Sequence, residues 1–91
     1  MKLKIILTNQ FKKDLKRAKK RGRNLDLLDQ TVTKLANQEP LPQSCRDHDL
    51  SGGWTGFREC HIQPDWLLIY RIDHTSLILI LFRNGSHADL F

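Results

Sequence analysis

Two strongly apolar runs near the end of the chain constrain the fold more than any other feature. They cover residues 66–72 and 76–82, and only the polar segment 73–75 lies between them. Apolar runs of this length, joined by so short a turn, indicate two paired β-strands. The second run is apolar at both sets of alternating positions, so we expect it to be the most buried strand. Pairing of the runs would bring together the polar stretches that flank them, residues 47–65 and 83–91.

The first part of the chain predicts a strand and then two helices. Residues 2–7 alternate between polar and apolar and then turn wholly apolar, as in a strand with one buried end. A helix begins after the N-cap candidate Thr8 and ends at Gly22, because glycine commonly follows the last turn of a helix. A second helix begins after Asn24 and is stopped by Pro40, because proline cannot continue a helix.

After the second helix the apolar period changes from helical to strand-like. Gly52 and Gly53 mark a turn, residues 54–62 alternate, and residues 87–91 can add a short edge strand. A strand, two helices and then further strands predict an α+β fold in one domain, residues 1–91. We expect the two-helix hairpin to cover one face of a largely antiparallel, twisted sheet. The other face would be left open and concave.

Basic residues are concentrated at the start of the chain. Residues 1–23 carry ten of the fifteen Lys and Arg residues but only one of the ten acidic residues, Asp14. A solvated helix face with cations near its C-terminus accounts for two or three of these charges. Like charges this dense repel one another unless a polyanion is present, so we favour binding to a nucleic-acid backbone. The candidate contacts are Lys16, Arg17 and Lys20.

Cysteine content and hydropathy indicate the cellular compartment in which we expect the protein. The two cysteines are too few for the disulfide scaffold of a small secreted domain. No apolar run is long enough for a signal peptide or for a membrane span. We therefore expect a cytoplasmic protein with free thiols and no membrane partner.

Three of the four histidines stand where small enzymes carry reactive groups. His48, His61 and His87 lie beside glycines or at the ends of predicted strands. His74 falls in a predicted turn, where we expect an exposed side chain outside any site. A single histidine of this kind is more often structural than catalytic. Three of them, together with Asp65 and Arg83, make an active site and a structural role about equally well supported.

Two kinds of chemistry fit these residues. The first is a metal site, but no HExxH spacing and no Cys/His pairing supports it. The second is cleavage of RNA without metal or cofactor, in which one group takes the proton of a ribose 2′-OH and another protonates the leaving 5′-oxygen. Histidine suits both steps because its ordinary pKa lies near neutrality. Arg83 would stabilise the charge that develops on the phosphate.

The aromatic residues allow two interpretations as well. They are most simply core residues, but unpaired bases also stack on aromatic rings. Trp66 is a stacking candidate because it follows Asp65 directly. Phe91 is another because it lies four residues after His87.

Three motifs follow one another in the second half of the chain. They read Asp47-His48-x-Leu50-x-Gly52-x-Trp54-x-Gly56-x-Arg58, His61-x-x-Pro64-Asp65-Trp66-x-Leu68-Ile69-Tyr70 and Gly85-x-His87-x-x-Leu90-Phe91. In this order and spacing they resemble the YafQ-type toxins of the RelE/ParE superfamily. The first half matches those toxins in layout, with a short strand and a basic helical hairpin.

The resemblance implies a RelE-like fold of the microbial-ribonuclease type. It implies an endoribonuclease, an mRNA interferase that cleaves mRNA in the ribosomal A site. Its partner would be a cognate antitoxin that represses their shared operon, so DNA would be reached only through the antitoxin complex. By position, the catalytic residues would be His48, His61, Asp65 and His87, and the substrate-binding residues Trp66, Arg83 and Phe91.

The sequence does not decide which residue is the general acid and which is the base, and it leaves two alternative functions. We expect His87 to be the general acid and Asp65 or His61 the base, although the roles could be reversed. A ParE-like toxin that inhibits gyrase belongs to the same superfamily, but such toxins do not need this histidine set. A non-catalytic nucleic-acid-binding module would depend on the basic helix and not on His87.

Overall fold

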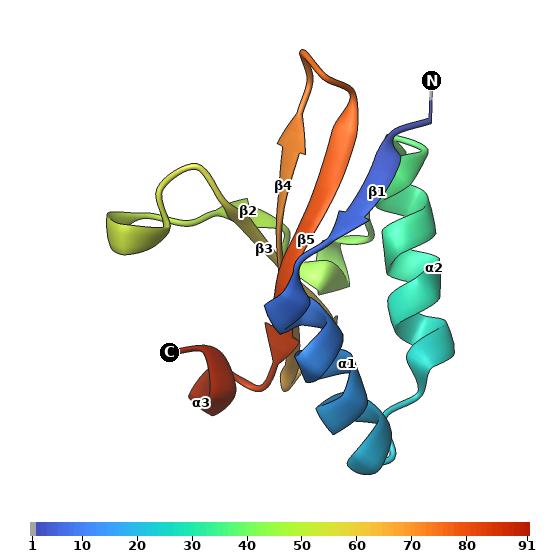
Figure 1. Ribbon diagram of the computed structural model, residues 1–91, viewed down its shortest axis with the longest axis vertical. Helices are drawn as coiled ribbons and strands as arrows, with labels where there is room; N and C mark the ends of the chain where they lie inside the picture. Colours follow the sequence, from blue (N-terminus) through green and yellow to red (C-terminus); the bar gives the residue numbers. More distant parts are fainter. Residues whose placement is uncertain (1) are drawn as a thin grey trace.

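Five strands form one sheet at the centre of the molecule (Figure 1). The structure is a computed structural model that describes residues 2–91. The strands are β1 (Lys4–Leu7), β2 (His48–Asp49), β3 (Arg58–Gln63), β4 (Trp66–Asp73) and β5 (Ile78–Gly85). Across the sheet their order is β1-β5-β4-β3-β2, and β1 is parallel to β5 while all other neighbours are antiparallel. The predicted pairing of the two apolar runs, as β4 and β5, and the α+β fold are confirmed.

Two helices follow β1, namely α1 (Asn9–Lys20) and α2 (Leu25–Ala36). The side chains of Thr8 and Asn24 each accept a hydrogen bond of 3.0 Å from a backbone N–H in the first turn, so both predicted N-caps are formed. Gly22 follows α1 with a φ of 76°, a left-handed conformation that glycine adopts without steric cost. The caps and this glycine therefore set the two predicted starts and the predicted end of α1, whereas α2 ends at Ala36, before Pro40 is reached.

The main core lies between the two helices and one face of the sheet. Phe11 of α1 and Leu28 of α2 pack in it with Trp66, Leu68 and Tyr70 of β4. The three β4 side chains alternate along the strand, so they mark the face of the sheet that the helices cover. Removal of these large apolar side chains from water is the main stabilising contribution to the fold.

A smaller apolar cluster covers part of the opposite face. Leu67 and Ile69, which alternate with the core residues of β4, pack there against Leu90 of the C-terminal helix α3 (His87–Leu90). In Figure 1, α3 and the loop beyond β2 lie on one side of the sheet and α2 on the other. The expectation of an open second face is therefore wrong for this region. The partly buried side chains around the cluster are Leu50, Trp54, Phe57 and Phe82.

Residues 87–91 do not form the edge strand that we expected. The Ser86 side chain accepts a hydrogen bond from the backbone N–H of Asp89 at 3.2 Å, and the Asp89 carboxylate accepts one from the N–H of Ser86 at 2.8 Å. This capping box satisfies backbone N–H groups that a strand would have paired with a neighbour. His87 consequently stands in the first turn of a helix.

The second apolar run begins later than predicted and is not the most buried strand. The carboxylate of Asp73 accepts hydrogen bonds from the backbone of Thr75 (2.9 Å) and Ser76 (3.1 Å), which extends the turn to Leu77 at a φ of 56°. The most buried strand is β4, whose residues 66–70 are all buried. It is covered by the helices on one face and by the smaller cluster on the other.

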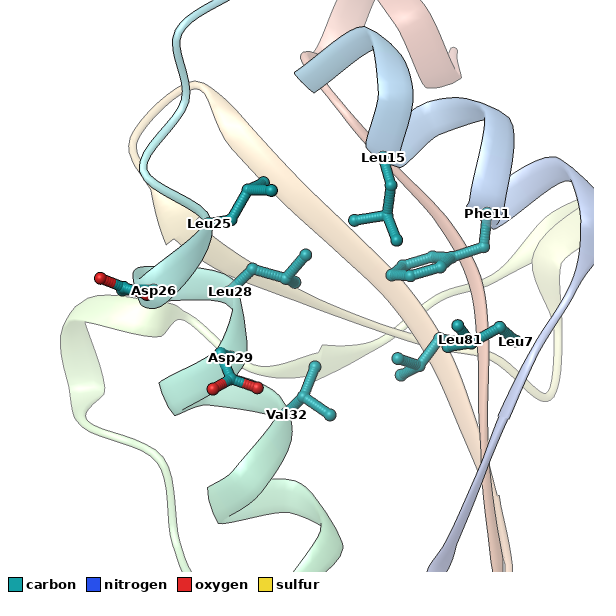
Figure 2. Close-up of a pocket in the computed structure, with 9 residues that line it drawn as sticks. All are labelled: Leu7, Phe11, Leu15, Leu25, Asp26, Leu28, Asp29, Val32 and Leu81. Atoms are coloured by element: carbon teal, nitrogen blue, oxygen red, sulfur yellow. The ribbon is translucent and has the colours of Figure 1, made fainter. Parts of the chain in front are cut away.

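A groove of about 360 Å³ lies between α1 and α2 on the helix side of the sheet (Figure 2). Its lining is mainly apolar, with Leu15 and Leu28 on facing helices and Leu81 on the sheet between them. Asp26 and Asp29 are the acidic residues among its lining. Because these side chains belong to the helix side, the groove is separate from the histidines described next.

Candidate active site

Strand pairing places two of the candidate histidines on the face that carries the smaller cluster. On β3, Glu59 and His61 alternate with Cys60, which belongs to the main core on the helix side. His48 of β2 lies directly opposite Glu59, and His61 lies opposite Leu67 of β4. Residues directly opposite one another in antiparallel strands point to the same face. His48 and His61 therefore share the face that lies away from α1 and α2.

The short helix α3 brings His87 and Phe91 to the same side of the sheet. Leu90 anchors the helix in the smaller cluster. The ring centroids of His87 and Phe91 are 5.0 Å apart, and those of Phe91 and Trp54 are 6.1 Å apart. Phe91 is 50% exposed, so its ring can contact a planar group such as a base.

His48 is exposed, and its tautomer is fixed by a backbone carbonyl. The Nδ1 atom lies 2.6 Å from the carbonyl oxygen of Arg46. A carbonyl oxygen only accepts hydrogen bonds, so Nδ1 carries the hydrogen. The Nε2 atom of the neutral ring is then the one that can accept a proton.

A polar network holds the two residues beside His48. Arg58 donates hydrogen bonds to Asp47 (2.9 Å) and to Asp49 (2.6 Å), and the buried Tyr70 hydroxyl donates to Asp47. The hydrogen bond to Asp47 raises the pKa of the Arg58 guanidinium, so its charge is secure at neutral pH. Burial, and then the bond to Asp47, raise the pKa of the Tyr70 hydroxyl, which stays protonated as the donor. The segment that carries His48 is thus tied to β3 and β4.

His61 is half-buried and faces a carboxylate that sequence reasoning did not select. Its Nε2 atom lies 3.6 Å from Oε1 of Glu59, which is 7% exposed, and its Nδ1 atom lies 3.3 Å from the carbonyl oxygen of Pro64. An imidazolium at His61 would form an ion pair with Glu59. The signal for Glu59 was present, because strict alternation puts it on the same side of β3 as His61.

Asp65 lies exposed in the turn between β3 and β4, and its neighbour Trp66 is fully buried. The Trp66 indole N–H donates to the side-chain oxygen of Asn84 at 3.2 Å, and the Arg23 guanidinium lies 5.5 Å from the centroid of the Trp66 ring. A base has no access to a ring with 0% exposure. The expectation that Trp66 is a stacking platform is therefore corrected: Trp66 is a core residue that anchors the turn of Asp65.

Two of the predicted phosphate-binding arginines are bound to one buried carboxylate. Arg83 donates from Nε to Asp14 at 2.8 Å, and Arg17 donates from Nη2 to Asp14 at 3.0 Å. Asp14 is 1% exposed, whereas the Arg83 and Arg17 side chains keep 23% and 37% of their surface in solvent. Both arginines are therefore held in place and still reach the surface. Lys16 and Lys20 stand exposed on α1.

The described part of the chain has neither a metal-binding cluster nor a membrane-spanning helix. Within residues 2–91, no three His, Cys, Asp or Glu side chains are grouped so that they could hold a metal ion, and we assign no metal ligands to the chain. None of the helices in this range has the length and apolar character that crossing a bilayer requires.

Comparison with known proteins identifies a family that the chain matches. Residues 3–91 match the model of a family described as the bacterial toxin of a type II toxin–antitoxin system, YafQ. The mRNA interferase toxin YafQ of Escherichia coli K12 is 42% identical over 88 residues, which cover 96% of this chain and 94% of that protein. The match to the family model spans all three motifs of the second half of the chain.

Solved structures agree with this match. A metal-bound toxin from Helicobacter pylori is 46% identical, with a TM-score of 0.92 and coverage of 98% of this chain and 99% of that chain. A chain of the Escherichia coli DinJ–YafQ toxin–antitoxin complex is 39% identical, with a TM-score of 0.89 and coverage of 100% and 99%. At these sequence identities, the similarity shows a shared family as well as a shared fold.

Proposed function

Because the chain belongs to the YafQ family of bacterial type II toxin–antitoxin toxins, we propose that it is an endoribonuclease that cleaves mRNA in the ribosomal A site. The observation that carries the proposal is the grouping of His48, His61 and His87 on one side of the sheet, from three separate elements. A binding module or a gyrase inhibitor has no need for such a grouping. The name of the Escherichia coli relative, an mRNA interferase, supports the same reaction.

The reaction requires one group to accept a proton and another to donate one. His61 takes the proton of the ribose 2′-OH, whose oxygen then attacks the adjacent phosphorus. The bond from phosphorus to the 5′-oxygen breaks, and His87 gives its proton to that oxygen. We assign the base to His61 because the buried Glu59, 3.6 Å away, would stabilise the imidazolium that forms. Asp65 is the alternative base named by the family motif.

The remaining residues position RNA and stabilise charge. His48, as an imidazolium with a hydrogen on Nε2, and Arg83, whose side chain is partly exposed, would donate hydrogen bonds to the phosphate oxygens as their charge grows. Phe91 would stack against a base beside the cleaved bond. Lys16 and Lys20 would attract RNA phosphates without regard to sequence. A ribosome that presents the mRNA supplies orientation, so free RNA would be a poor substrate.

A cognate antitoxin would be the protein partner, and the site of action would be the cytoplasm, where mRNA is translated. The support is the family itself and the DinJ–YafQ complexes among the similar structures. DNA association would arise only through the antitoxin complex.

Cleavage of mRNA on programmed ribosomes tests the proposal. The wild-type protein, with and without prior EDTA treatment and removal of the chelator, is compared with His87→Ala and with His74→Ala, a matched control in an exposed turn. We expect cleavage by the wild type, survival of that cleavage after EDTA treatment of the protein, loss in His87→Ala and retention in His74→Ala. Cleavage by His87→Ala at the wild-type rate would overturn the assignment of the general acid. Absence of cleavage by the wild type, with DNA damage in cells that express it, would favour gyrase as the target.

A further inference from the structure

The end of α1 contacts α3, the helix that carries His87. Arg21, the residue that follows α1, donates two hydrogen bonds to Asp89: Nη1 to Oδ2 at 2.5 Å and Nη2 to Oδ1 at 3.1 Å. This two-pronged geometry fixes both position and orientation of the partners. Asp89 also completes the capping box of α3 with Ser86. One carboxylate therefore both begins α3 and ties it to α1.

Two residues further on, Arg23 contacts the turn that carries Asp65. Its Nη2 atom donates to the backbone carbonyl of Asp65 at 2.9 Å. Its guanidinium also lies 5.5 Å from the centroid of the Trp66 ring, a cation–π contact. Arg23 therefore holds the β3–β4 turn by its backbone and by its buried tryptophan, and leaves the Asp65 carboxylate to solvent.

Both tethered segments need outside support. A four-residue helix such as α3 has no stability of its own in water, and Leu90 is its one residue in the smaller cluster. The β3–β4 turn is anchored at its base by the buried Trp66, but its tip is exposed at Pro64 and Asp65. Acid–base catalysis tolerates positional errors of only about 0.5 Å, so the short helix and the exposed tip both need a further contact with a rigid element.

We infer that Arg21 and Arg23 form a bracket at the end of α1 that sets the separation between the Asp65 turn and His87. They are positioning residues for the chemistry and do not themselves contact RNA. The inference rests on the proposed nuclease function. The inference gives the basic end of α1 a positioning role, in addition to the phosphate binding that its composition predicts.

Electrostatics agree with this arrangement. The hydrogen bond to Asp89 raises the pKa of Arg21, and the charges of Asp89 and Asp65 add to the same effect. Conversely, the hydrogen bond from Arg21 holds the pKa of Asp89 below its usual range, and the backbone N–H of Ser86 adds to this. Both Arg21 and Asp89 are charged at neutral pH, and Arg21 also interacts electrostatically with the nearby Asp65 carboxylate.

Single-turnover cleavage on ribosomes separates a bracket from a phosphate contact. Arg21→Gln is compared with Lys19→Gln, which removes the same charge from an exposed position two residues earlier on α1. We expect Arg21→Gln and Arg23→Gln to lower the rate constant at saturating ribosome by about 10- to 100-fold with KM nearly unchanged, because misplacement of about 1 Å has effects of this size. Lys19→Gln should instead raise KM and reduce its dependence on salt. Arg21→Lys, which retains one donor, should recover part of the rate.

A double-mutant cycle tests whether the loss of cleavage rate comes from the interaction between Arg21 and Asp89. Asp89→Asn keeps an oxygen that can cap α3 but loses the charge that binds Arg21. If the pair acts as a unit, combining Asp89→Asn with Arg21→Gln costs little more than either change alone. Additive losses, or equal behaviour of Arg21→Gln and Lys19→Gln, would overturn the bracket.

A structural readout keeps the inference testable if the proposed function fails. The Hε1 resonance of His87 reports the nearby Phe91 ring, whose centroid is 5.0 Å from that of the His87 ring. Nuclear magnetic resonance spectra should show this signal shifted or broadened in Arg21→Gln and unchanged in Lys19→Gln. A wild type that cleaves nothing, with this pattern intact, would reject the nuclease and keep the bracket. An unmoved His87 signal in Arg21→Gln would reject the bracket alone.

Discussion

The carboxylate of Asp14 in α1 accepts a hydrogen bond from Nε of Arg83 in β5, 69 positions later in the chain, at 2.8 Å. Asp14 is 1% exposed, and its acceptors are also used by Arg17, by Gln10 and by the backbone N–H of Asn84. A buried charge is tolerated only when it is paired and hydrogen-bonded. Asp14 therefore joins the first helix to the strand that leads to His87.

Replacement of Asp14 should destabilise the whole fold. Asp14→Asn keeps the shape of the side chain but leaves Arg83 and Arg17 without their counter-charge. We expect the free energy of unfolding in urea to fall by about 3 kcal/mol, at the low end for a broken buried pair because both arginines are partly exposed. Asp29→Asn, at an exposed position on α2, should change it by less than about 0.5 kcal/mol. Equal stability of the two variants would contradict this account.

The single tyrosine of the chain gives a direct test of the network beside His48. Burial and the hydrogen bond to Asp47 raise the pKa of Tyr70. Ultraviolet absorbance of tyrosinate, followed as pH rises, should therefore show no ionisation of the folded protein near the ordinary value of about 10. The same titration in urea should return to that value. A folded-state midpoint near 10 would mean that the hydroxyl is not bound as described.

Loss of the Tyr70 hydroxyl should loosen the segment that holds His48. Tyr70→Phe leaves the ring in the core and removes the hydrogen bond to Asp47. We expect a loss of about 1–2 kcal/mol in the free energy of unfolding, together with faster amide hydrogen exchange at residues 47–49. Unchanged exchange there, beside a measurable loss of stability, would show that Arg58 alone fixes the segment.

The pair of Asp89 and Arg21 should make stability depend on pH in the acid range. The folded-state pKa of Asp89 lies below its unfolded value of about 3.9. Ionised Asp89 therefore stabilises the fold at any pH above about 4, and this contribution disappears as pH falls through the folded-state pKa. The wild type should exceed Asp89→Asn in free energy of unfolding at neutral pH, and this difference should shrink progressively as pH falls below about 4. A constant difference across this range would contradict the ion pair.

Phe91 should act on RNA binding and not on the chemical step. Its ring is half exposed beside His87. Phe91→Leu should raise KM by roughly ten-fold, or about 1.4 kcal/mol, which lies within the stacking energy of about 1–3 kcal/mol for one base, and Phe91→Tyr should keep KM close to that of the wild type. Measurement of KM and kcat on programmed ribosomes checks this. A fall in kcat alone would instead place Phe91 among the residues that orient His87.

Periodicity predicted the elements that are long enough to show it. Both helices have their apolar faces and caps encoded locally, and β4 and β5 were visible as apolar runs. The helix α3 was missed because four residues, His87 to Leu90, are too few for a helical period. The Ser86-x-x-Asp89 capping pattern was the available signal. The two-residue strand β2 and the parallel pairing of β1 depend on tertiary contacts that leave no local trace.

Some features of the candidate site could also be predicted from the sequence, and others could not. The types and positions of the histidines and of Asp65 were predictable because they belong to contiguous motifs. The burial of Trp66 was not, because an indole ring suits both a core and a stacking platform. The contacts of Asp14, Arg21 and Arg23 link positions far apart in the sequence, so no spacing rule could have found them.

The place of β5 in the sheet has a consequence for the protein's own synthesis. β5 is the last strand to be made, yet it lies between β1 and β4, and the first strand pairs with it at Lys4 and Ile78. A nascent chain that has not released β5 has no partner for β1 and no support for α3. The pairing of β1 with β5 must therefore wait until residues 78–85 have left the ribosome, since contacts so distant in sequence form late. A nascent chain that stops short of residue 87 would lack one of the three histidines of the candidate site.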